Sequence, residues 1–353
     1  MSKKVVAVIF GGKSSEHEIS KISATFIMRN MSEDKYRYIP IYMTKNGEWK
    51  LYDGSIDNIV SGNWESYAAT CILSPSTEHK GLFRIVGDKI KNIPVDVIFP
   101  VLHGKGGEDG TIQGLFEMAG IPYVGCGVLS SAVSMDKSYT KIIAEKAGIP
   151  QAKYVVTHSY ELDNMEKTLD EIEEKLGYPC FIKPSRAGSS VGVSKAHNRE
   201  EAKEGILLAA DNDMTIVIEE FISGREVETA VLGNIDIQVS CVGEVLVADE
   251  FYSFDAKYNN KESKTVMPAD LPEETSEKIR EYAGRVYKAL DCRGLSRVDF
   301  FVKAGGDIIF NEINTLPGFT PISMYPMLFK TVGIDTAELI DKLIETALSG
   351  EER

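Results

Sequence analysis

Hydrophobic and polar positions alternate along the N-terminal part of the chain in a pattern that predicts a parallel α/β sheet. Short apolar runs at Val5–Phe10, Tyr38–Met43 and Val95–Val101 are typical of buried strands. Thr111–Ala119 has the spacing of an amphipathic helix. Strands that alternate with helices favour a parallel sheet, and such sheets bind ligands at the carboxyl ends of their strands.

The pattern changes twice further along the chain, which predicts three domains at residues 1–127, 128–222 and 223–353. The middle part alternates helices with strands, and the last part is rich in strands until its final helix. The expected elements after Gly127 are helices at Met135–Ala147, Glu166–Leu176, Glu200–Ala210, Glu273–Leu290 and Thr336–Leu348, and strands at Tyr154–Thr157, Cys180–Lys183, Thr215–Glu220, Glu226–Gly233, Asp236–Val242 and Glu244–Phe251.

The run from Arg297 to Asn314 predicts a hairpin that carries chemistry. If Gly305-Gly306 forms its turn, Asp299 lies opposite Glu312 and Arg297 lies opposite Asn314, all on one face. Carboxylates this close repel each other unless a cation lies between them. Two carboxylates and an amide oxygen suit magnesium. A solvated sheet face is the alternative, but both motifs flank apolar strands of core quality, so we favour a metal site.

Composition limits the classes of function. The chain has 43% hydrophobic and 26% charged residues, as an ordinary globular protein does, and a net charge of −14. This charge argues against non-specific binding to nucleic acid or to an anionic membrane. It does not exclude a local basic cleft.

The cysteines and the apolar runs indicate the cellular compartment in which we expect the protein. The five cysteines are scattered and odd in number, which predicts reduced thiols. The apolar run after Lys3-Lys4 meets Gly11-Gly12 at once, so we expect a buried strand rather than a signal peptide. With no run of membrane-spanning length, we expect a cytoplasmic protein.

The first glycine-rich turn, Gly11-Gly12-Lys13-Ser14, resembles a Walker loop, but Ala7 stands where that motif needs a glycine. The simpler interpretation is a strand followed by a glycine turn and the start of a helix. The positive end of that helix would favour an anion. Glu16 lies in this first helical turn. It either complements the helix dipole or holds a substrate ammonium group, and the residues leave both open.

A second glycine-rich loop, Leu102–Gly110, follows an apolar strand and precedes a helix. Four glycines raise the entropic cost of ordering the loop, so we expect it to approach a ligand closely. His103 is therefore a candidate substrate-binding residue. A capping or core histidine is the alternative.

A third loop, Lys183–Val193, joins two strands and is rich in glycine and serine. Its N–H groups, including that of Ser190, and the Lys183 charge suit phosphate oxygens. Lys137 opens a helix and could reach the same phosphates, and the alternative for the loop is a mobile surface hairpin.

Acidic residues close the strand at Thr215–Glu220. Glu219 and Glu226 could bind an adenine amino group and ribose hydroxyls, with Ile222 as an apolar wall, although each signal is weak alone. Further on, the polar loop from Phe251 to Pro268 is typical of a lid and carries Lys257 and Tyr258.

The segment Leu316–Met324 follows the predicted metal strand directly. Gly318 can present a backbone N–H to a substrate, and Ser323 can present a hydroxyl. We therefore expect this segment to complete the substrate end of the site.

Together these blocks resemble the ATP-grasp superfamily and, within it, the D-alanine–D-alanine ligases. The resemblance runs in order through GGKSSEHEIS, PVLHGKGGEDGTIQG, MDK, FIKPSRAGSSVGVSK, FDAKY, SRVDFF and FNEINTLPGFTPISMYP. It implies an N-terminal α/β domain followed by two ATP-grasp subdomains that clamp ATP. It also implies that ATP phosphorylates one D-alanine, that a second D-alanine attacks the acyl phosphate, and that the enzyme is a homodimer.

The resemblance implies a role for each matching residue. Glu16 would bind the first ammonium group, with Ser189 and Tyr258 closing the lid; Lys137, Lys183 and Lys257 would bind phosphates; Glu219, Ile222 and Glu226 would hold adenine and ribose. Asp299, Glu312 and Asn314 would bind two Mg²⁺ ions, which Mn²⁺ can replace. Arg297 and the Gly318 N–H would stabilise the oxyanion, and Ser323 and the Met324 N–H would receive the second carboxylate.

Three alternatives remain. Ligases of the vancomycin-resistance type, which use D-serine or D-lactate, share most of these blocks. Asp255–Tyr258 and Ser323–Pro326 resemble the D-alanine type, whereas Gly47–Trp49 and Arg186–Ser189 also resemble the D-serine type. A nucleotide-binding regulatory module would lack a metal ligand or the arginine, and a dehydrogenase would need the GxGxxG motif that is absent.

Overall fold

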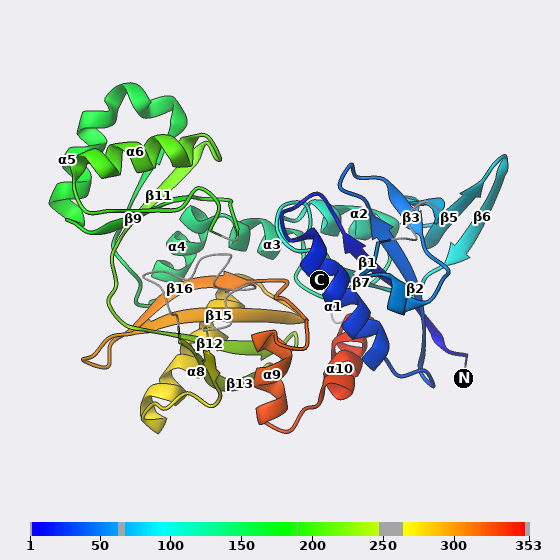
Figure 1. Cartoon of the computed structure of the whole chain (residues 1–353). Coiled ribbons are helices and arrows are strands. Elements are labelled where there is room, and N and C mark those ends of the chain that lie inside the picture. Colours follow the sequence, from blue (N-terminus) through cyan, green and yellow to red (C-terminus); the bar gives the residue numbers. More distant parts are fainter. Residues whose placement is uncertain (1, 63–67, 189, 247–263, 350–353) are drawn as a thin grey trace.

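Three β-sheets organise the molecule (Figure 1). The computed structural model describes residues 2–62, 68–188, 190–246 and 264–349 of the chain. The second sheet and its helices stand above the third sheet, and the first sheet lies beside both. This arrangement leaves one face of the second sheet opposite one face of the third.

The first sheet has the order β6-β5-β4-β3-β2-β1-β7. As predicted, its centre is parallel: β1 (Lys4–Gly11) pairs with β2 (Tyr36–Met43) and β7 (Val97–Val101). Alternate side chains of β1 enter two different cores, Val6, Val8 and Phe10 on one face and Ala7 and Ile9 on the other. Both faces of β1 are therefore buried, which explains its unbroken apolar run.

The pattern of the sequence predicted the parallel strands of this sheet but not its antiparallel edge. Four antiparallel strands extend it: β3 (Trp49–Leu51), β4 (Ala69–Leu73), β5 (Gly81–Val86) and β6 (Lys89–Pro94). These strands are short, and β6 is exposed along nearly its whole length. A half-exposed edge has no continuous apolar run, so the pattern gave little signal there.

Helices from both ends of the chain cover the first sheet. Helix α1 (His17–Asn30) and the C-terminal helix α10 (Thr336–Leu348) pack on the same side, against β7 and against each other. Helix α2 (Thr111–Ala119) covers the opposite side through Ile112 and Phe116. The C-terminal segment is thus joined to the N-terminal sheet by one core.

The second sheet is antiparallel, in the order β10-β9-β11-β8. Its strands are β8 (Tyr154–His158), β9 (Cys180–Pro184), β10 (Ser194–Ala196) and β11 (Thr215–Glu220). Helices α5 (Met165–Lys175) and α6 (Arg199–Ala210) bury its alternate residues, such as Ile182 and Ile218. Side chains point alternately to the two faces of a strand, so Lys183 and Glu219, which follow these isoleucines, face away from the helices.

The third sheet, β14-β13-β12-β15-β16, is also antiparallel. Its strands are β12 (Arg225–Leu232), β13 (Gln238–Leu246), β14 (Lys264–Val266), β15 (Leu295–Val302) and β16 (Ile308–Asn314). Helix α8 (Glu273–Ala289) packs on one face, and α9 (Met324–Thr331) packs against β12 and β13. Helix α9 covers one end of its face of the sheet, at Ala230 and Leu232 of β12. Glu226 and Glu228 lie on the same face of β12, toward its other end.

Two predicted boundaries in this region were wrong. The strands expected at Asp236–Val242 and Glu244–Phe251 are one strand, β13, in the described residues, because Gly243 pairs with Glu228 within the ladder. A Cβ at Gly243 would lie 2.7 Å from Met324 Cε. The glycine therefore permits close packing of α9 rather than a turn.

The helix expected from Met135 begins two residues later. Helix α3 (Val128–Met135) ends at Asp136, which caps α4 (Lys137–Lys146) by accepting a hydrogen bond from Ser138 N at 3.1 Å. Figure 1 shows α4 between the second and third sheets. The cap thus sets where Lys137 and the following turn of α4 meet the space between these sheets.

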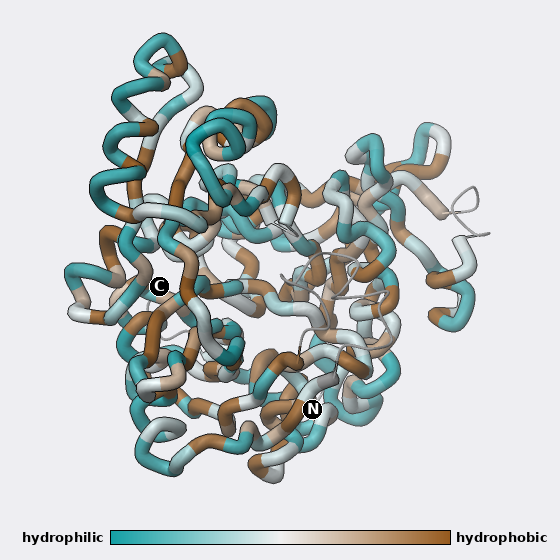
Figure 2. Tube along the Cα trace, turned by 60° about the vertical axis from the view of Figure 1, so that its left-hand side comes forward, coloured by the Kyte–Doolittle hydropathy of each residue, from teal (hydrophilic) through white to brown (hydrophobic). Residues whose placement is uncertain are grey.

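Hydrophobic segments run through the interior, and hydrophilic segments lie along the outer helices and turns (Figure 2). Short 3₁₀ turns at Ile56–Asn58 and Ser159–Asn164 complete the structure. None of the helices in the described ranges is long and apolar enough to cross a membrane.

Candidate active site

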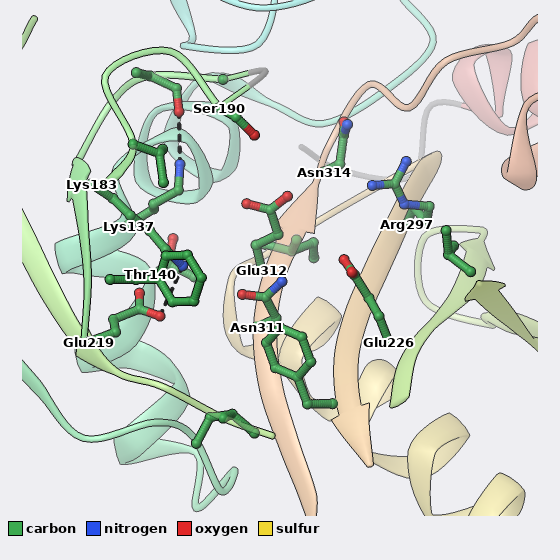
Figure 3. A pocket seen from close by; sticks show the side chains of 18 of the residues that line it. Lys137, Thr140, Lys183, Ser190, Glu219, Glu226, Arg297, Asn311, Glu312 and Asn314 are labelled. Carbon is green, nitrogen blue, oxygen red and sulfur yellow. Dashed lines mark hydrogen bonds and ion pairs between the residues drawn. The ribbon is translucent and has the colours of Figure 1, made fainter. Parts of the chain in front are cut away.

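A cleft of about 570 Å³ lies between the second and third sheets (Figure 3). It reaches the carboxyl end of the first sheet, where Glu16 and His103 line it. It brings together residues from all three parts of the chain. The predicted site residues that line it are Glu16, His103, Lys137, Lys183, Ser190, Glu219, Ile222, Glu226, Arg297, Glu312, Asn314 and Gly318. Ser189, Lys257 and Tyr258 lie outside the described residues.

The hairpin of β15 and β16 has the predicted pairing at its functional end. Asp299 is opposite Glu312, and Arg297 is opposite Asn314. The turn is one residue longer than predicted: Lys303 N donates to Asp307 O at 2.9 Å, and Gly306 has φ 90°. A bulge at Asn311 absorbs the extra residue, because Phe300 pairs with Phe310.

Arg297 is held by two buried carboxylates. Its Nε and Nη2 donate to the two oxygens of Asp299 at 2.8 and 2.7 Å, and its Nε lies 2.9 Å from Glu228 Oε2. Burial lowers the pKa of Arg297, but Asp299, Glu228 and Glu312 outweigh it and the pKa is raised. Asp299 is only 2% exposed and lies behind Arg297 rather than on the cleft wall.

The donor chemistry of this hairpin fits magnesium. Asp299, Glu312 and Asn314 supply only oxygen ligands from one face of the strand pair. Three carboxylates, Asp299, Glu228 and Glu312, act on the single charge of Arg297, so the region has excess negative charge. Within the described ranges no cluster of three His, Cys, Asp or Glu side chains forms here. The fit therefore depends on the two carboxylates together with the Asn314 amide.

On the opposite wall, Glu219 lies between two lysines. Lys183 Nζ donates to Glu219 Oε2 at 3.0 Å, and Lys141 Nζ lies 3.3 Å from Oε1. Burial raises the pKa of Glu219, but the two ammonium groups outweigh it and lower the pKa to about 2. Burial lowers the pKa of Lys183, whereas Glu219, Glu312 and Glu226 raise it further than burial lowers it. Both groups are therefore charged at neutral pH.

The loop after β9 is tied to the start of α4. Ser185 O accepts from Lys137 N, and Ser185 Oγ accepts from Ser138 N, each at 3.0 Å. Lys137 Nζ donates to Ala187 O at 2.9 Å. Lys137 and the loop that contains Ser190 therefore lie together across the cleft from Glu312, as Figure 3 shows.

Apolar side chains form a small cluster beside Glu219. Ile222 and Ile309 pack with Ala152, and Phe301 packs against them. Ile222 and Phe301 line the cleft. This end of the cleft thus combines an apolar wall with a charged acceptor, which suits a flat heteroaromatic ring.

At the other end of the cleft, Glu16 and His103 lie close to a second carboxylate, Glu108. His103 is 5% exposed, with Nδ1 3.1 Å from Leu316 O and 3.8 Å from Glu108 Oε1. Burial lowers the pKa of His103, but Glu108 and Glu16 outweigh it and the pKa is raised. His103 is thus buried, as a core histidine would be, and it also lines the cleft, as a substrate-binding residue would.

Glu16 faces the cleft rather than capping its helix. It is the N-cap residue of α1, but its side chain makes no capping hydrogen bond. Glu18, two residues further along, instead pairs with Lys21 at 3.0 Å and Lys45 at 3.3 Å. The geometry therefore favours a ligand-binding role for Glu16 over a purely dipolar one.

Ser323 and Met324 do not line the cleft wall. Ser323 Oγ accepts from Thr320 N at 2.8 Å, and a Cβ at Gly318 would lie 3.1 Å from the same oxygen. The Met324 side chain is 7% exposed and packs in the core below β13. A buried side chain leaves the backbone N–H of Met324 as the group that the sequence predicted to bind substrate.

Two family models match the chain, D-ala D-ala ligase N-terminus at residues 5–126 and D-ala D-ala ligase C-terminus at residues 143–345. The chain belongs to the D-alanine–D-alanine ligase family. The family and the mixed α/β fold that the resemblance implied are therefore confirmed.

Relatives of the family match the chain along nearly its whole length. A D-alanine–D-alanine ligase of Acetivibrio thermocellus is 56% identical and covers 98% of this chain, with 96% of the relative covered. The ligase of Ruminiclostridium cellulolyticum is 54% identical, with coverage of 100% and 97%.

Solved structures of the family have the same fold. The VanG D-Ala:D-Ser ligase of Enterococcus faecalis matches with a TM-score of 0.90, 43% identity and coverage of 98% and 100%. The D-alanine–D-alanine ligase of Coxiella burnetii matches with a TM-score of 0.83, 31% identity and coverage of 98% and 96%.

Three charged residues of this ligase-family chain were not predicted from the sequence: Glu108 and Lys141, which line the cleft, and Glu228, which pairs with Arg297. Lys141 follows Lys137 by one helical turn, and Glu228 follows Glu226 by one strand repeat, so the periodicity of each element carried a signal. Glu228 also pairs with Asp299 across β12 and β15. Which strand lies beside β15 is a tertiary fact that a local pattern does not contain.

Proposed function

We propose that this protein is an ATP-dependent D-alanine–D-alanine ligase that supplies the dipeptide for peptidoglycan precursors. The proposal rests on one observation: the cleft gathers lysines, carboxylates and Arg297 from three segments of a chain that belongs to this family. ATP and a carboxylate are both anions, and clustered cations let them approach each other. Because the whole chain has a net charge of −14, anions such as ATP should bind at this local cationic group and not over the surface in general.

The nucleotide end of the cleft would hold ATP through its own residues. Lys137 and Lys183 would bind phosphate oxygens, and Lys257 and Ser190 would join them. Glu219 would accept from the adenine amino group, and Glu226 from ribose hydroxyls. Ile222 would pack on the ring.

Asp299, Glu312 and Asn314 would hold two Mg²⁺ ions, or Mn²⁺ in their place. When bound, these ions would neutralise charge between the triphosphate and the substrate carboxylate. Because Asp299 pairs with Arg297 on both oxygens, it would share its carboxylate between the guanidinium and a cation.

The chemistry needs no covalent intermediate on the protein. A carboxylate oxygen of the first D-alanine attacks the γ-phosphorus, and ADP leaves. The amine of the second D-alanine, having lost a proton, then attacks the acyl carbon, and inorganic phosphate leaves. Glu16 would hold the first ammonium group, with His103 beside it, while Arg297 and the Gly318 N–H would stabilise the oxyanion. Ser323 and the Met324 N–H would receive the second carboxylate, and Ser189 and Tyr258 would help close the site.

The test is release of phosphate from ATP and Mg²⁺ with D-alanine alone and with D-alanine plus D-serine or D-lactate, with products identified by mass. Dominant D-alanyl-D-alanine in every mixture is the expected result. No phosphate release with any D-amino acid would contradict the ligase proposal and favour a nucleotide-binding regulatory module.

A D-alanine–D-serine ligase is the second candidate. The match to the VanG D-Ala:D-Ser ligase, at 43% identity and a TM-score of 0.90, favours it. A methyl against a hydroxymethyl group changes binding in an apolar pocket by only about 1–3 kcal/mol, so small differences decide. A dominant mixed dipeptide with D-serine at neutral pH would assign the protein to this type.

We further propose a homodimer that works in the cytoplasm, where ATP is available. The family resemblance supports the dimer. Light scattering coupled to size-exclusion chromatography should give a mass near twice the 38.9 kDa of the chain. A mass near that of a single chain would contradict the dimer.

A further inference from the structure

Lys141 is a buried lysine whose surroundings differ from those of an ordinary ion pair. It lies on α4, and its side chain is 2% exposed yet lines the cleft. Its Nζ is 3.3 Å from Glu219 Oε1, but within the residues that the structure describes it has no hydrogen-bond acceptor in suitable geometry. A buried ammonium group with unused donors is costly, so a purely structural role explains it poorly.

The two lysines on Glu219 have different surroundings. Lys183 is attracted by Glu312 and Glu226 as well as by Glu219, so it faces the centre of the cleft. A bound triphosphate would attract it further from Glu219. Lys141 packs beside the Tyr154 ring, with its Nζ 5.3 Å from the ring centroid. We therefore expect Lys141, rather than Lys183, to stay with Glu219 when a nucleotide enters.

The charge state of Glu219 decides which base it can recognise. An ionised carboxylate only accepts hydrogen bonds, whereas a protonated one also donates. Adenine presents an amino donor at its six position, and guanine presents a carbonyl acceptor there. An ionised Glu219 thus accepts from adenine and repels the guanine carbonyl.

We propose that Lys141 is a positioning residue for nucleotide selection: its buried ammonium keeps the Glu219 carboxylate ionised and oriented, so that the cleft takes adenine nucleotides in preference to guanine nucleotides. This inference rests on the proposed function, in which Glu219 faces the adenine ring. It adds Lys141, a residue that does not contact the base itself, to the groups that select the nucleotide.

The experiment measures binding of ADP and of GDP to the full chain by calorimetry, which does not require turnover. Lys141→Met removes the charge and keeps the length, Lys141→Arg keeps the charge, and Lys146→Met is the control. Lys146 is an exposed lysine on the same helix. In Lys141→Met the dissociation constant for ADP should rise on the order of tenfold to a hundredfold, because Glu219 loses one of the two cations that favour its ionised form.

The ratio of GDP to ADP dissociation constants should fall by about tenfold or more in the same variant. Lys141→Arg should restore most of both values, and Lys146→Met should change neither. In the steady state, KM for ATP should rise while kcat and KM for D-alanine stay near the wild-type values.

A pH profile of the wild type covers the case in which Lys141→Met fails to fold. Burial, with Lys183 and Lys137, lowers the pKa of Lys141, and Glu219 opposes this shift only in part. Besides these charges it faces the Tyr154 phenol, whose pKa is raised by burial and by Glu145. ADP binding by the wild type should therefore weaken as pH rises toward the alkaline range. Lys141→Arg should lack this weakening.

The outcomes separate the inference from the proposed function. An unchanged preference for ADP in Lys141→Met, or a pH profile that is the same in wild type and Lys141→Arg, would overturn the inference, as would a wild type that binds neither nucleotide. ADP binding that depends on Lys141 in a wild type that makes no dipeptide would support the inference and contradict the ligase proposal.

Discussion

Arg297 and Asp299, two residues apart on β15, form a two-point ion pair in which Nε and Nη2 each donate to one carboxylate oxygen, at 2.8 and 2.7 Å. The proposed mechanism gives these residues different tasks, oxyanion stabilisation and metal binding. The pair joins the two tasks, because any cation that attracts Asp299 also changes what holds Arg297. Glu228, at 2.9 Å from Arg297 Nε, can keep the guanidinium in place while Asp299 turns to a cation.

Replacing Arg297 should separate catalysis from nucleotide binding. Arg297→Ala should lower kcat by about 10²–10³, because the charge on the tetrahedral intermediate loses its donor. It also leaves Asp299 and Glu228 without their cation, which should reduce stability by about 3–5 kcal/mol. ADP binding, measured by calorimetry, should stay close to wild type.

Arg297→Lys is the matched variant for this prediction. It keeps the charge between the two carboxylates but loses the two-point fork, so it should recover stability more than kcat. Full turnover by Arg297→Ala would exclude the oxyanion role.

Glu312 should control the affinity for the divalent cation. Glu312→Gln keeps the shape of the side chain and removes one of the two predicted carboxylate ligands, so binding of Mn²⁺ in the presence of ADP should weaken on the order of tenfold or more. Electron paramagnetic resonance of free Mn²⁺ measures this without turnover. Asp307→Asn, at the exposed turn of the same hairpin, should leave the titration unchanged. Equal Mn²⁺ binding by Glu312→Gln and wild type would place the metal elsewhere.

A glycine contact joins the N-terminal lobe to the third sheet. Gly294 has φ 69°, and a Cβ there would lie 2.8 Å from Gly125 N and 3.1 Å from Gly125 Cα. Gly294→Ala should therefore combine left-handed strain of about 1–2 kcal/mol with a backbone clash.

Gly306→Ala is the control for the strain alone. Gly306 has φ 90°, but among the described residues nothing lies within 4 Å of its added Cβ. Thermal unfolding should show a larger loss for Gly294→Ala, by several degrees at about 2–4 °C per kcal/mol. Equal losses would mean that the backbone contact at Gly125 relaxes without cost.

The sequence predicted the parts of the site that depend on local periodicity. Asp299 and Glu312 pair as expected because strand alternation and a nearby glycine turn set the register. The longer turn was not predicted, since the Asn311 bulge compensates for it and leaves the functional end in register. An insertion and a bulge that cancel leave little trace in a pattern of period two.

Other features depend on contacts between distant segments. The burial of Arg297 and Asp299 beside Glu228 follows from the position of β12 next to β15. His103 lies against Leu316 O, more than two hundred residues away in sequence. Neither feature has a local signature, so the sequence indicated candidate residues without these partners.

The His103 and Glu108 pair should make stability depend on pH in a defined direction. The pKa of His103 is raised, against the effect of burial, by Glu108 and Glu16. A raised pKa in the folded state contributes stability that is present below the unfolded value of about 6.5 and is lost as pH rises through the folded value. Burial, with Glu16, also raises the pKa of Glu108, so its contribution too is lost as pH rises.

Glu108→Gln removes the contribution of Glu108 and weakens that of His103, without a change of side-chain size. The wild type should therefore be more stable than Glu108→Gln near pH 6, and the difference should shrink or reverse toward pH 9, because the histidine then loses its proton while the carboxylate stays buried. Thermal unfolding midpoints across this range measure the difference. His79→Gln, at a histidine outside the cleft, should show no such convergence with the wild type. A difference between wild type and Glu108→Gln that grows with pH would mean that the carboxylate is stabilised as the anion by some other group, and that His103 is neutral beside it.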